Sequence, residues 1–188
     1  MELQRLVDIG SNLLAHHLDV LERVGLIQRS RSSGDGRRRY VHVRRDAFVG
    51  LEPGTRRRPT RALFVCTHNS ARSQLAAALW RTLAHAPAES AGTDPANRVH
   101  PGAVAAAARA GLDLSSATPR RLDEVGHLPS LVVTVCDRAH ETIDPPARWL
   151  HWSIPDPVAS RSKTAFDLAL TTIRDRIATV VDFERIRA

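Results

Sequence analysis

The residues best suited to chemistry in this chain are a cysteine and an arginine six positions apart. Cys66 ends a short apolar run, and Arg72 opens a segment rich in Ala and Leu. This order predicts a strand, a tight loop and a helix, so that backbone N–H groups and the helix N-terminus form an anion-binding cradle. The same field is expected to lower the pKa of the Cys66 thiol toward its nucleophilic thiolate. Arg72 can hold two oxygens of a tetrahedral oxyanion through its planar guanidinium.

The expected cradle spans the loop between these two residues. Its members are Cys66, Thr67, His68, Asn69, Ser70, Ala71 and Arg72, and Ser73 follows directly. The pattern predicts a thiolate that attacks a bound phosphate-like anion. A small buried cysteine beside a solvated arginine is the plainer alternative, and the strand, loop and helix context favours the catalytic one.

A proton donor for the leaving oxygen is the second requirement of such chemistry, and Asp156 is the candidate. A carboxyl group suits this role. Asp156 lies in the sequence IPDPV, where two prolines exclude regular structure and predict a rigid loop. Taken alone, this pattern fits an ordinary turn aspartate equally well.

The elements that must position these residues follow from the pattern of apolar runs. Strands are expected at residues 61–66, 88–93, 131–136 and 148–154. Helices are expected at residues 74–85, 100–111 and 163–186. Strands that alternate with helices predict an α/β fold, a four-stranded parallel sheet flanked by helices. Ligands bind at the carboxyl ends of such strands, so Cys66, Cys136 and the loop of Asp156 should meet at one edge of the sheet.

Four ordered motifs in the last two-thirds of the chain resemble the low-molecular-weight tyrosine phosphatase family, and within it the arsenate reductase branch. They are VCTHNSARSQ, SAGT, VVTVCDRA and HWSIPDP. The resemblance implies that Cys66 is the nucleophile, that Arg72 binds the oxyanion and that Asp156 is the general acid. By the same resemblance, Asn69 braces the loop and Ser73 hydrogen-bonds to the thiolate.

Two features favour arsenate over phosphotyrosine as the substrate. Residues 158–160 (VAS) are small, whereas the phosphatases place aromatic residues after the Asp-Pro pair to hold the tyrosine ring. A small oxyanion such as arsenate or phosphate suits that open edge better. The second feature is Cys136, since thioredoxin-coupled arsenate reductases use a cysteine there in a redox relay. The third cysteine of that relay is replaced by Ile143 in this chain.

The broken relay implies that electrons come from outside the chain. We expect no bound cofactor, and a small thiol such as mycothiol, with a glutaredoxin-like or thioredoxin-like redox protein, to complete the reduction. Lys163 is the only lysine, and this preference for arginine is typical of the high-GC genomes in which mycothiol occurs. Cys136 is either a redox partner of Cys66 or a buried structural thiol. A tyrosine phosphatase is the alternative enzyme.

Residues 1–45 have a pattern of their own. Residues 2–7 predict a short helix, and SNLLAHHLDVLERVGLI predicts a second one, with Ser11 as N-cap and Gly25 as its stop. The apolar stripe of this second helix comprises Leu13, Leu14, Leu18, Leu21 and Val24. IQRSRSSGDGRRRYVHV then predicts a hairpin with arginines around its Ser-Gly-Asp-Gly turn.

This order resembles a partial winged helix-turn-helix of the arsenic-responsive repressor family, whose second helix enters the DNA major groove while the wing touches the backbone. The resemblance covers the helix pair and the hairpin, and we expect the module to lack the helix that precedes the pair in that family. The resemblance implies contacts with operator DNA from Ser11, Asn12, His16, His17, Arg31, Arg37, Arg38 and Arg39. It leaves open a homodimer, and a transcription regulator whose second domain senses an oxyanion without turnover. Adjacent histidines point to different helix faces, so we expect no metal site.

Composition and charge favour a two-part intracellular protein. The net charge is +7, and residues 1–61 carry 13 arginines against seven acidic residues, so the basic character belongs to the DNA-binding candidate. There is no signal-peptide pattern or long apolar run, and two cysteines do not make a disulfide scaffold. We therefore expect a cytoplasmic protein without membrane contact. Its parts are a DNA-binding module at residues 1–45, a linker at residues 46–60 and the enzyme domain at residues 61–188.

Overall fold

The computed structural model describes residues 2–48, 61–160 and 162–181 of the 188-residue chain. Most of the expected linker, residues 49–60, lies outside the described residues. The chain divides into two compact units, Met1–Ser32 with Gly36–Gly54 and Ser33–Asp35 with Thr55–Ala188. Among the helices that are described, none combines the length and the apolar character needed to cross a bilayer.

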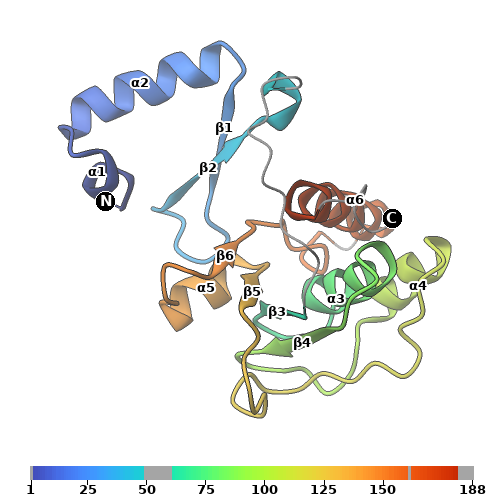
Figure 1. The fold of residues 1–188 in the computed structure, drawn as a ribbon. Coiled ribbons are helices and arrows are strands. Elements are labelled where there is room, and N and C mark those ends of the chain that lie inside the picture. The colour runs from blue at the N-terminus through green and yellow to red at the C-terminus, as the bar shows by residue number, and fades with distance from the viewer. Residues whose placement is uncertain (1, 49–60, 161, 182–188) are drawn as a thin grey trace. The chain divides into compact units, whose positions relative to one another are not determined.

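The larger unit is built around a four-stranded parallel sheet in the order β4-β3-β5-β6 (Figure 1). Its strands are β3 (Ala62–Cys66), β4 (Ala88–Gly92), β5 (Leu131–Thr134) and β6 (Leu150–His151). In the register, Cys66 lies opposite Gly92, and Val65 lies opposite Thr134. The carboxyl ends of these three strands therefore meet at one edge. The predicted α/β fold with a four-stranded parallel sheet is confirmed, although β6 has only two residues.

Four helices lie in the described part of this unit. They are α3 (Arg72–Leu83), α4 (Pro101–Arg109), α5 (Asp137–Ile143) and α6 (Lys163–Val180). Helices α3, α4 and α6 pack against one another (Figure 1). The three predicted helices are present, whereas α5 was not predicted, because seven residues are too few to show a helical period. The expected C-terminal helix is described to Val180, and residues 182–188 lie outside the described residues.

The central strand β3 is buried on both faces, as a parallel strand inside an α/β fold requires. Phe64 points into the larger apolar cluster, where its ring lies 5.8 Å from the rings of Trp80 on α3 and Trp152 after β6. Leu63 and Val65 point to the opposite face and a smaller cluster. Full burial of a side chain of this size contributes about 2 kcal/mol to folding. The tightly packed strand β3 therefore holds the start of the loop that follows it in place.

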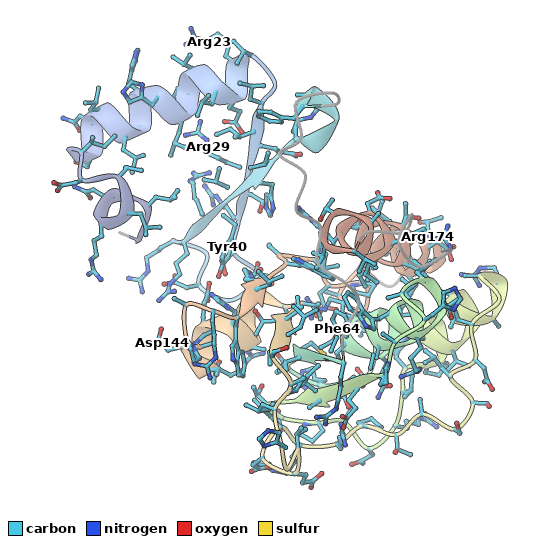
Figure 2. The ribbon with its side chains drawn as sticks, in the orientation of Figure 1. Arg23, Arg29, Tyr40, Phe64, Asp144 and Arg174 are labelled. Carbon is cyan, nitrogen blue, oxygen red and sulfur yellow. The ribbon has the colours of Figure 1, made fainter. Side chains whose placement is uncertain are left out.

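The smaller unit has the predicted order of two helices and a hairpin. Its described elements are α1 (Glu2–Val7), α2 (Ser11–Arg23), β1 (Ile27–Arg31), β2 (Arg39–Val43) and the 3-10 helix η1 (Arg45–Phe48). The two strands pair antiparallel. Arg29 of β1, labelled in Figure 2, forms ion pairs with Asp19 and Glu22 of α2 at 2.7 and 2.6 Å. These ion pairs join the hairpin to the helix.

One expectation for α2 is wrong. Ser11 is the first residue of the helix, and Gly10 is the N-cap residue, in an extended conformation without a side-chain capping bond. Gly25 does follow the helix end in the left-handed region, with φ of 78°. No residue of α2 is buried, and Leu13 and Val24 are 49% and 61% exposed. Two residues of the apolar stripe of α2 are therefore exposed, and the other three, Leu14, Leu18 and Leu21, are half-buried.

Candidate active site

The loop after β3 is held by hydrogen bonds from the segment at residues 94–100. Three of its carbonyl oxygens accept backbone N–H groups at 2.8 to 2.9 Å. The pairs are Thr67 with Asp94, His68 with Ala96 and Ser70 with His100. The carbonyl of His68 thus points outward, while the next N–H group, that of Asn69, donates inward to Sγ of Cys66 at 3.2 Å. Outward carbonyls and inward N–H groups are the geometry of an anion cradle.

Gly92, at the end of β4, permits the close approach of this loop. A Cβ at this position would lie 2.6 Å from the carbonyl oxygen of Thr67 and 3.0 Å from the Cβ of Asn69. Such a contact with backbone is too short for a packed interior. Asn69 itself has φ of 47°, a left-handed conformation that Asn tolerates better than most residues. The SAGT motif contains Gly92, but the motif alone does not explain why a glycine is needed. The reason is that Gly92 pairs with Cys66 in the sheet and thus lies against the loop.

Cys66 lies at the floor of the cradle and is 3% exposed. Its Sγ lies 2.9 Å from Oγ of Ser73, in addition to the bond from Asn69. Burial raises the pKa of the Cys66 thiol, and the Arg72 charge and the Ser73 hydrogen bond offset this only in part. The predicted lowering of the pKa is therefore wrong for this structure, because the sequence does not reveal how deeply the sulfur is buried.

Arg72 and Asp156 meet across the mouth of the loop. Nη2 of Arg72 lies 3.1 Å from Oδ2 of Asp156, and its Nη1 donates to the carbonyl oxygen of Ile154 at 3.0 Å. The first turn of α3 thus holds the proline-flanked loop beside the cradle. Asp156 is half-buried and also caps its own turn, since Val158 N–H donates to Oδ1 at 3.1 Å. The structure brings together all three residues to which a catalytic role was assigned.

The other cysteine lies next to the same loop. Cys136 is the N-cap residue of α5 and is 1% exposed. Its Sγ lies 3.3 Å from Oγ1 of Thr67, the residue that follows Cys66. Both thiols are free. Of the remaining loop residues, Ala71 is buried and His68 is exposed.

Gln74, on the first turn of α3, is a buried neighbour of the cradle that the sequence did not single out. It is 5% exposed. Its Nε2 lies 3.1 Å from the carbonyl oxygen of Asn69, 3.3 Å from Oδ1 of Asn69 and 3.2 Å from the carbonyl oxygen of Thr118. Oδ1 of Asn69 also accepts the backbone N–H of Arg120 at 2.9 Å. The only signal in the sequence was the glutamine at the end of the VCTHNSARSQ motif.

A second polar cluster follows Cys136. Asp137 is buried, and its Oδ1 lies 3.2 Å from Nε2 of His151, whose Nδ1 lies 2.8 Å from Oγ1 of Thr134. The ring of His140 stacks on that of His151 at 4.1 Å. Burial raises the pKa of Asp137, but its hydrogen bonds, first among them the one with His151, outweigh burial and lower it to about 2. A charged Asp137 therefore anchors the start of α5.

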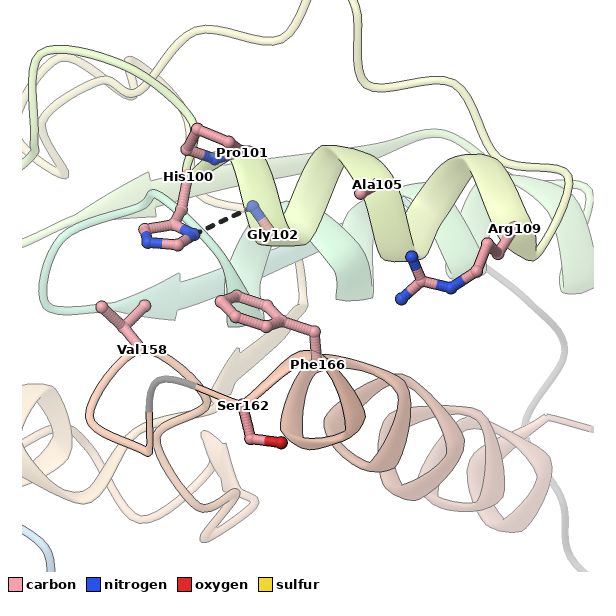
Figure 3. Close-up of a pocket in the computed structure, with 8 residues that line it drawn as sticks. All are labelled: His100, Pro101, Gly102, Ala105, Arg109, Val158, Ser162 and Phe166. Atoms are coloured by element: carbon pink, nitrogen blue, oxygen red, sulfur yellow. Dashed lines mark hydrogen bonds between the residues drawn. The ribbon is translucent and has the colours of Figure 1, made fainter.

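A pocket of about 510 Å³ adjoins the loop of Asp156 (Figure 3). It is lined by His100, Pro101, Gly102, Ala105, Arg109, Val158, Ser162 and Phe166. The rings of His100 and Phe166 stack at 5.0 Å. The backbone of His100 is bonded to Ser70 of the cradle, and Val158 is bonded to Asp156. Two of the lining residues are therefore hydrogen-bonded to residues of the site.

The eight residues assigned to DNA contact are all exposed. They are Ser11, Asn12, His16, His17, Arg31, Arg37, Arg38 and Arg39. The first four lie on α2, and Arg31 and Arg39 face each other across the hairpin. Two cations directly opposite each other repel, and an anionic partner would reduce this repulsion. Within the described residues, no group of three or more His, Cys, Asp and Glu side chains could hold a metal ion.

Comparisons with known proteins agree with this geometry. A relative from Staphylococcus epidermidis, arsenate reductase 2, is 32% identical over 130 residues, which make up 66% of this chain and 95% of that protein. The crystal structure of arsenate reductase from Archaeoglobus fulgidus is 36% identical, with a TM-score of 0.55 over 62% of this chain and 94% of that one. An arsenate reductase solved in its phosphate binding state is 25% identical, with a TM-score of 0.56 over 64% and 95%.

The matched part contains the whole candidate site. Residues 61–187 match the family described as low molecular weight phosphotyrosine protein phosphatase. This range includes the cradle that begins at Cys66, the loop of Asp156 and the segment around Cys136. Its sheet and helices have the fold of the solved arsenate reductases. The chain belongs to the low molecular weight phosphotyrosine protein phosphatase family.

Proposed function

We propose that the enzyme domain reduces arsenate to arsenite with electrons from an external thiol. The observation that carries the proposal is the convergence of Cys66, Arg72 and Asp156 around one cradle, with Arg72 and Asp156 3.1 Å apart. The inward N–H group of Asn69 and the guanidinium of Arg72 suit a tetrahedral oxyanion. The relatives named arsenate reductase support arsenate as that anion.

In the first step, arsenate binds in the loop and takes the place of Asp156 as the partner of Arg72. Asp156 then faces the bound anion, and a general acid acts there in its protonated form. The Cys66 thiolate attacks arsenic, the bond from arsenic to one oxygen breaks, and Asp156 protonates that oxygen so that water leaves. The product is a thiol–arsenate adduct in which arsenic is still pentavalent.

In the second step, a small thiol such as mycothiol displaces Cys66 from arsenic and returns the Cys66 thiolate. A glutaredoxin-like or thioredoxin-like thiol then attacks the sulfur of the resulting arseno-thiol. The sulfur–arsenic bond breaks, arsenic keeps the electron pair and leaves as arsenite, and the two sulfurs form a mixed disulfide. Ile143 stands at the third position of the internal relay, which is the reason for assigning these electrons to external thiols.

Cys136 offers an internal route for the same electrons. Its thiolate would attack the Cys66 sulfur of the adduct, release arsenite and leave a disulfide between the two cysteines. The contact of Cys136 with Thr67 supports access to the loop. The variant Cys136→Ser separates the routes: retained turnover with mycothiol and a glutaredoxin-like protein supports the external route, and lost turnover supports the internal one.

The test of the proposed function is arsenite formation over many turnovers, measured by chromatography of the arsenic species with each thiol donor. We expect turnover by the native chain and none by Cys66→Ser. Retained turnover in Cys66→Ser would contradict the proposal. Binding of one arsenate per chain without arsenite would identify an oxyanion sensor instead of an enzyme.

The pocket beside Asp156 favours phosphatase activity as a second candidate function. Val158 and Phe166 supply an apolar wall, and His100 supplies an aromatic one, where an organic leaving group could lie (Figure 3). Hydrolysis of p-nitrophenyl phosphate tests it. A kcat/KM above that for arsenate would make phosphate esters the better substrates, and the opposite order supports arsenate.

For the smaller unit we propose binding to operator DNA. The support is the exposed arginine pair Arg31 and Arg39 on the hairpin and the exposed polar residues of α2, which begin at Ser11. Phosphate contacts from arginines make such binding weaken steeply with salt. A gel shift with operator DNA from an arsenic-resistance operon at two salt concentrations is the test. We expect a salt-sensitive shift that Arg31→Ala reduces, and no shift at low salt would contradict the proposal.

A further inference from the structure

One backbone N–H group shows which atoms donate and which accept in the hydrogen bonds that link Asn69, Ser73 and Cys66. The N–H of Arg120 can only donate, and it lies 2.9 Å from Oδ1 of Asn69. This contact identifies the amide atom of Asn69 that faces Arg120 as the oxygen, so the amide nitrogen lies on the other side. Nδ2 of Asn69 accordingly lies 2.8 Å from Oγ of Ser73 and donates to it.

The orientation of Asn69 determines what Ser73 can offer to the sulfur. A hydroxyl group has one hydrogen. Because Oγ of Ser73 already accepts the Asn69 amide hydrogen, its own hydrogen is available for Sγ of Cys66 at 2.9 Å. Together with the Asn69 N–H at 3.2 Å, the sulfur receives two hydrogen bonds. Both favour the thiolate over the thiol, against the effect of burial.

Gln74 is the side chain that secures this arrangement. Its Nε2 carries two hydrogens and lies within 3.3 Å of three oxygens, of which two belong to Asn69 and one to Thr118. It thereby joins α3, the left-handed residue of the loop and the segment at residues 118–120. In this role Gln74 does not contact a bound anion. Its amide faces carbonyl oxygens, which an anion would not approach.

We propose that Gln74 is a positioning residue, which holds the Asn69 amide so that Ser73 donates its hydrogen to the Cys66 sulfur. This role deepens the proposed function, since it rests on Cys66 as the nucleophile. Without the Gln74 amide, the loop can rotate Asn69 away from Ser73. The Ser73 hydroxyl is then free to point away from the sulfur.

The experiment is the pH profile of Cys66 alkylation by iodoacetamide in the full chain, with the Cys66 peptide quantified by mass spectrometry. The test variant is Gln74→Met, which keeps the length and removes the amide. Thr82→Met, at an exposed position of α3, is the matched control. We expect the profile of Gln74→Met to shift by about one pH unit to higher pH, a loss of about tenfold in rate near neutral pH. Thr82→Met should follow the native profile.

A double-mutant cycle distinguishes this role from a general effect on the fold. In Ser73→Ala the hydroxyl is absent, so Gln74→Met should add little further shift. Equal shifts in both backgrounds would overturn the proposal, as would a native profile in Gln74→Met. If Gln74→Met does not fold, Gln74→Glu, which turns a carboxylate toward the same oxygens, serves instead with the same expected direction. Alkylation of Cys66 requires no arsenate. The result of this test therefore does not depend on whether the chain reduces arsenate.

Discussion

At the scale of single residues, burial and hydrogen bonding have opposite effects on the pKa of the Cys66 thiol. Burial raises the pKa of its thiol, while Arg72 and Ser73 act in the opposite direction. In the proposed mechanism, the positive groups around the sulfur are also those that bind the anion. On that proposal, one set of residues serves both the nucleophile and the anion that it attacks, and the same arginine holds Asp156, the proposed general acid.

The first prediction concerns Asp156. In Asp156→Asn the leaving oxygen has no proton donor, so we expect kcat for arsenate reduction to fall by about 10²- to 10⁴-fold. The KM for arsenate should not rise, because the carboxylate no longer competes for Arg72. Steady-state kinetics of arsenite formation measure both. Asp167→Asn is the control, since Asp167 forms an exposed ion pair with Arg109. A kcat within about threefold of the native value would remove Asp156 from the mechanism.

The second prediction concerns Gly92. In Gly92→Ala the new methyl group meets the carbonyl oxygen of Thr67, so the loop or β4 must move. We expect a loss of about 1–3 kcal/mol in the free energy of unfolding, together with a larger loss of arsenate turnover. Denaturant unfolding and arsenite formation measure these. Gly126→Ala has open space around it and should change neither. A fully active Gly92→Ala would show that the loop does not need this close approach.

At the scale of secondary-structure elements, the sequence predicted what depends on local pattern. The apolar run that ends at Cys66 and the helix after Arg72 were predicted because short-range periodicity determines them. The cap of α2 was assigned wrongly, since Gly10 and Ser11 are both acceptable at an N-cap. The role of Gln74 could not be predicted from its place in the VCTHNSARSQ motif, because one of its partners, Thr118, lies 44 residues away and meets it only in the folded protein.

The third prediction concerns the junction of β5 and α5. The pKa of Asp137 is lowered from 3.8 to about 2, so its charge stabilises the fold above pH 4, and this stabilisation is lost as pH falls toward 2. The loss should be about 2 kcal/mol in the free energy of unfolding. Denaturant unfolding at a series of pH values measures it. Asp137→Asn should lack this dependence and exposed Asp94→Asn should keep it. An unchanged dependence in Asp137→Asn would assign it to other groups.

At the scale of the whole molecule, two compact units differ in how they are stabilised. In the larger unit, the described strands and helices share a contiguous apolar core that contains Phe64 and Trp80. In the smaller unit, Ile27 is the one buried apolar residue among those described. A unit of this size with so little burial is marginal by itself. The family match covers residues 61–187, which lie in the larger unit, and leaves the smaller unit outside it.

The fourth prediction follows from that division. Every residue assigned to the chemistry lies within residues 61–188, so a fragment of this range should reduce arsenate with a kcat/KM within about twofold of the full chain. Arsenite formation by both proteins at equal concentration is the measurement. The Cys66→Ser form of the fragment is the control for background reduction. A fragment that folds, as shown by circular dichroism, and yet has lost turnover would show that residues 1–60 take part in the reaction.

The strand order β4-β3-β5-β6 has a consequence for the origin of the cradle. From β3 the chain passes first to β4 on one side and later to β5 on the other, so β3 is a topological switch point of the sheet. Connections that leave in opposite directions open a crevice at the carboxyl end of β3, whatever side chains line it. The crevice is thus a property of the strand order, and an exposed side chain at its rim, that of His68, can change while the scaffold stays the same.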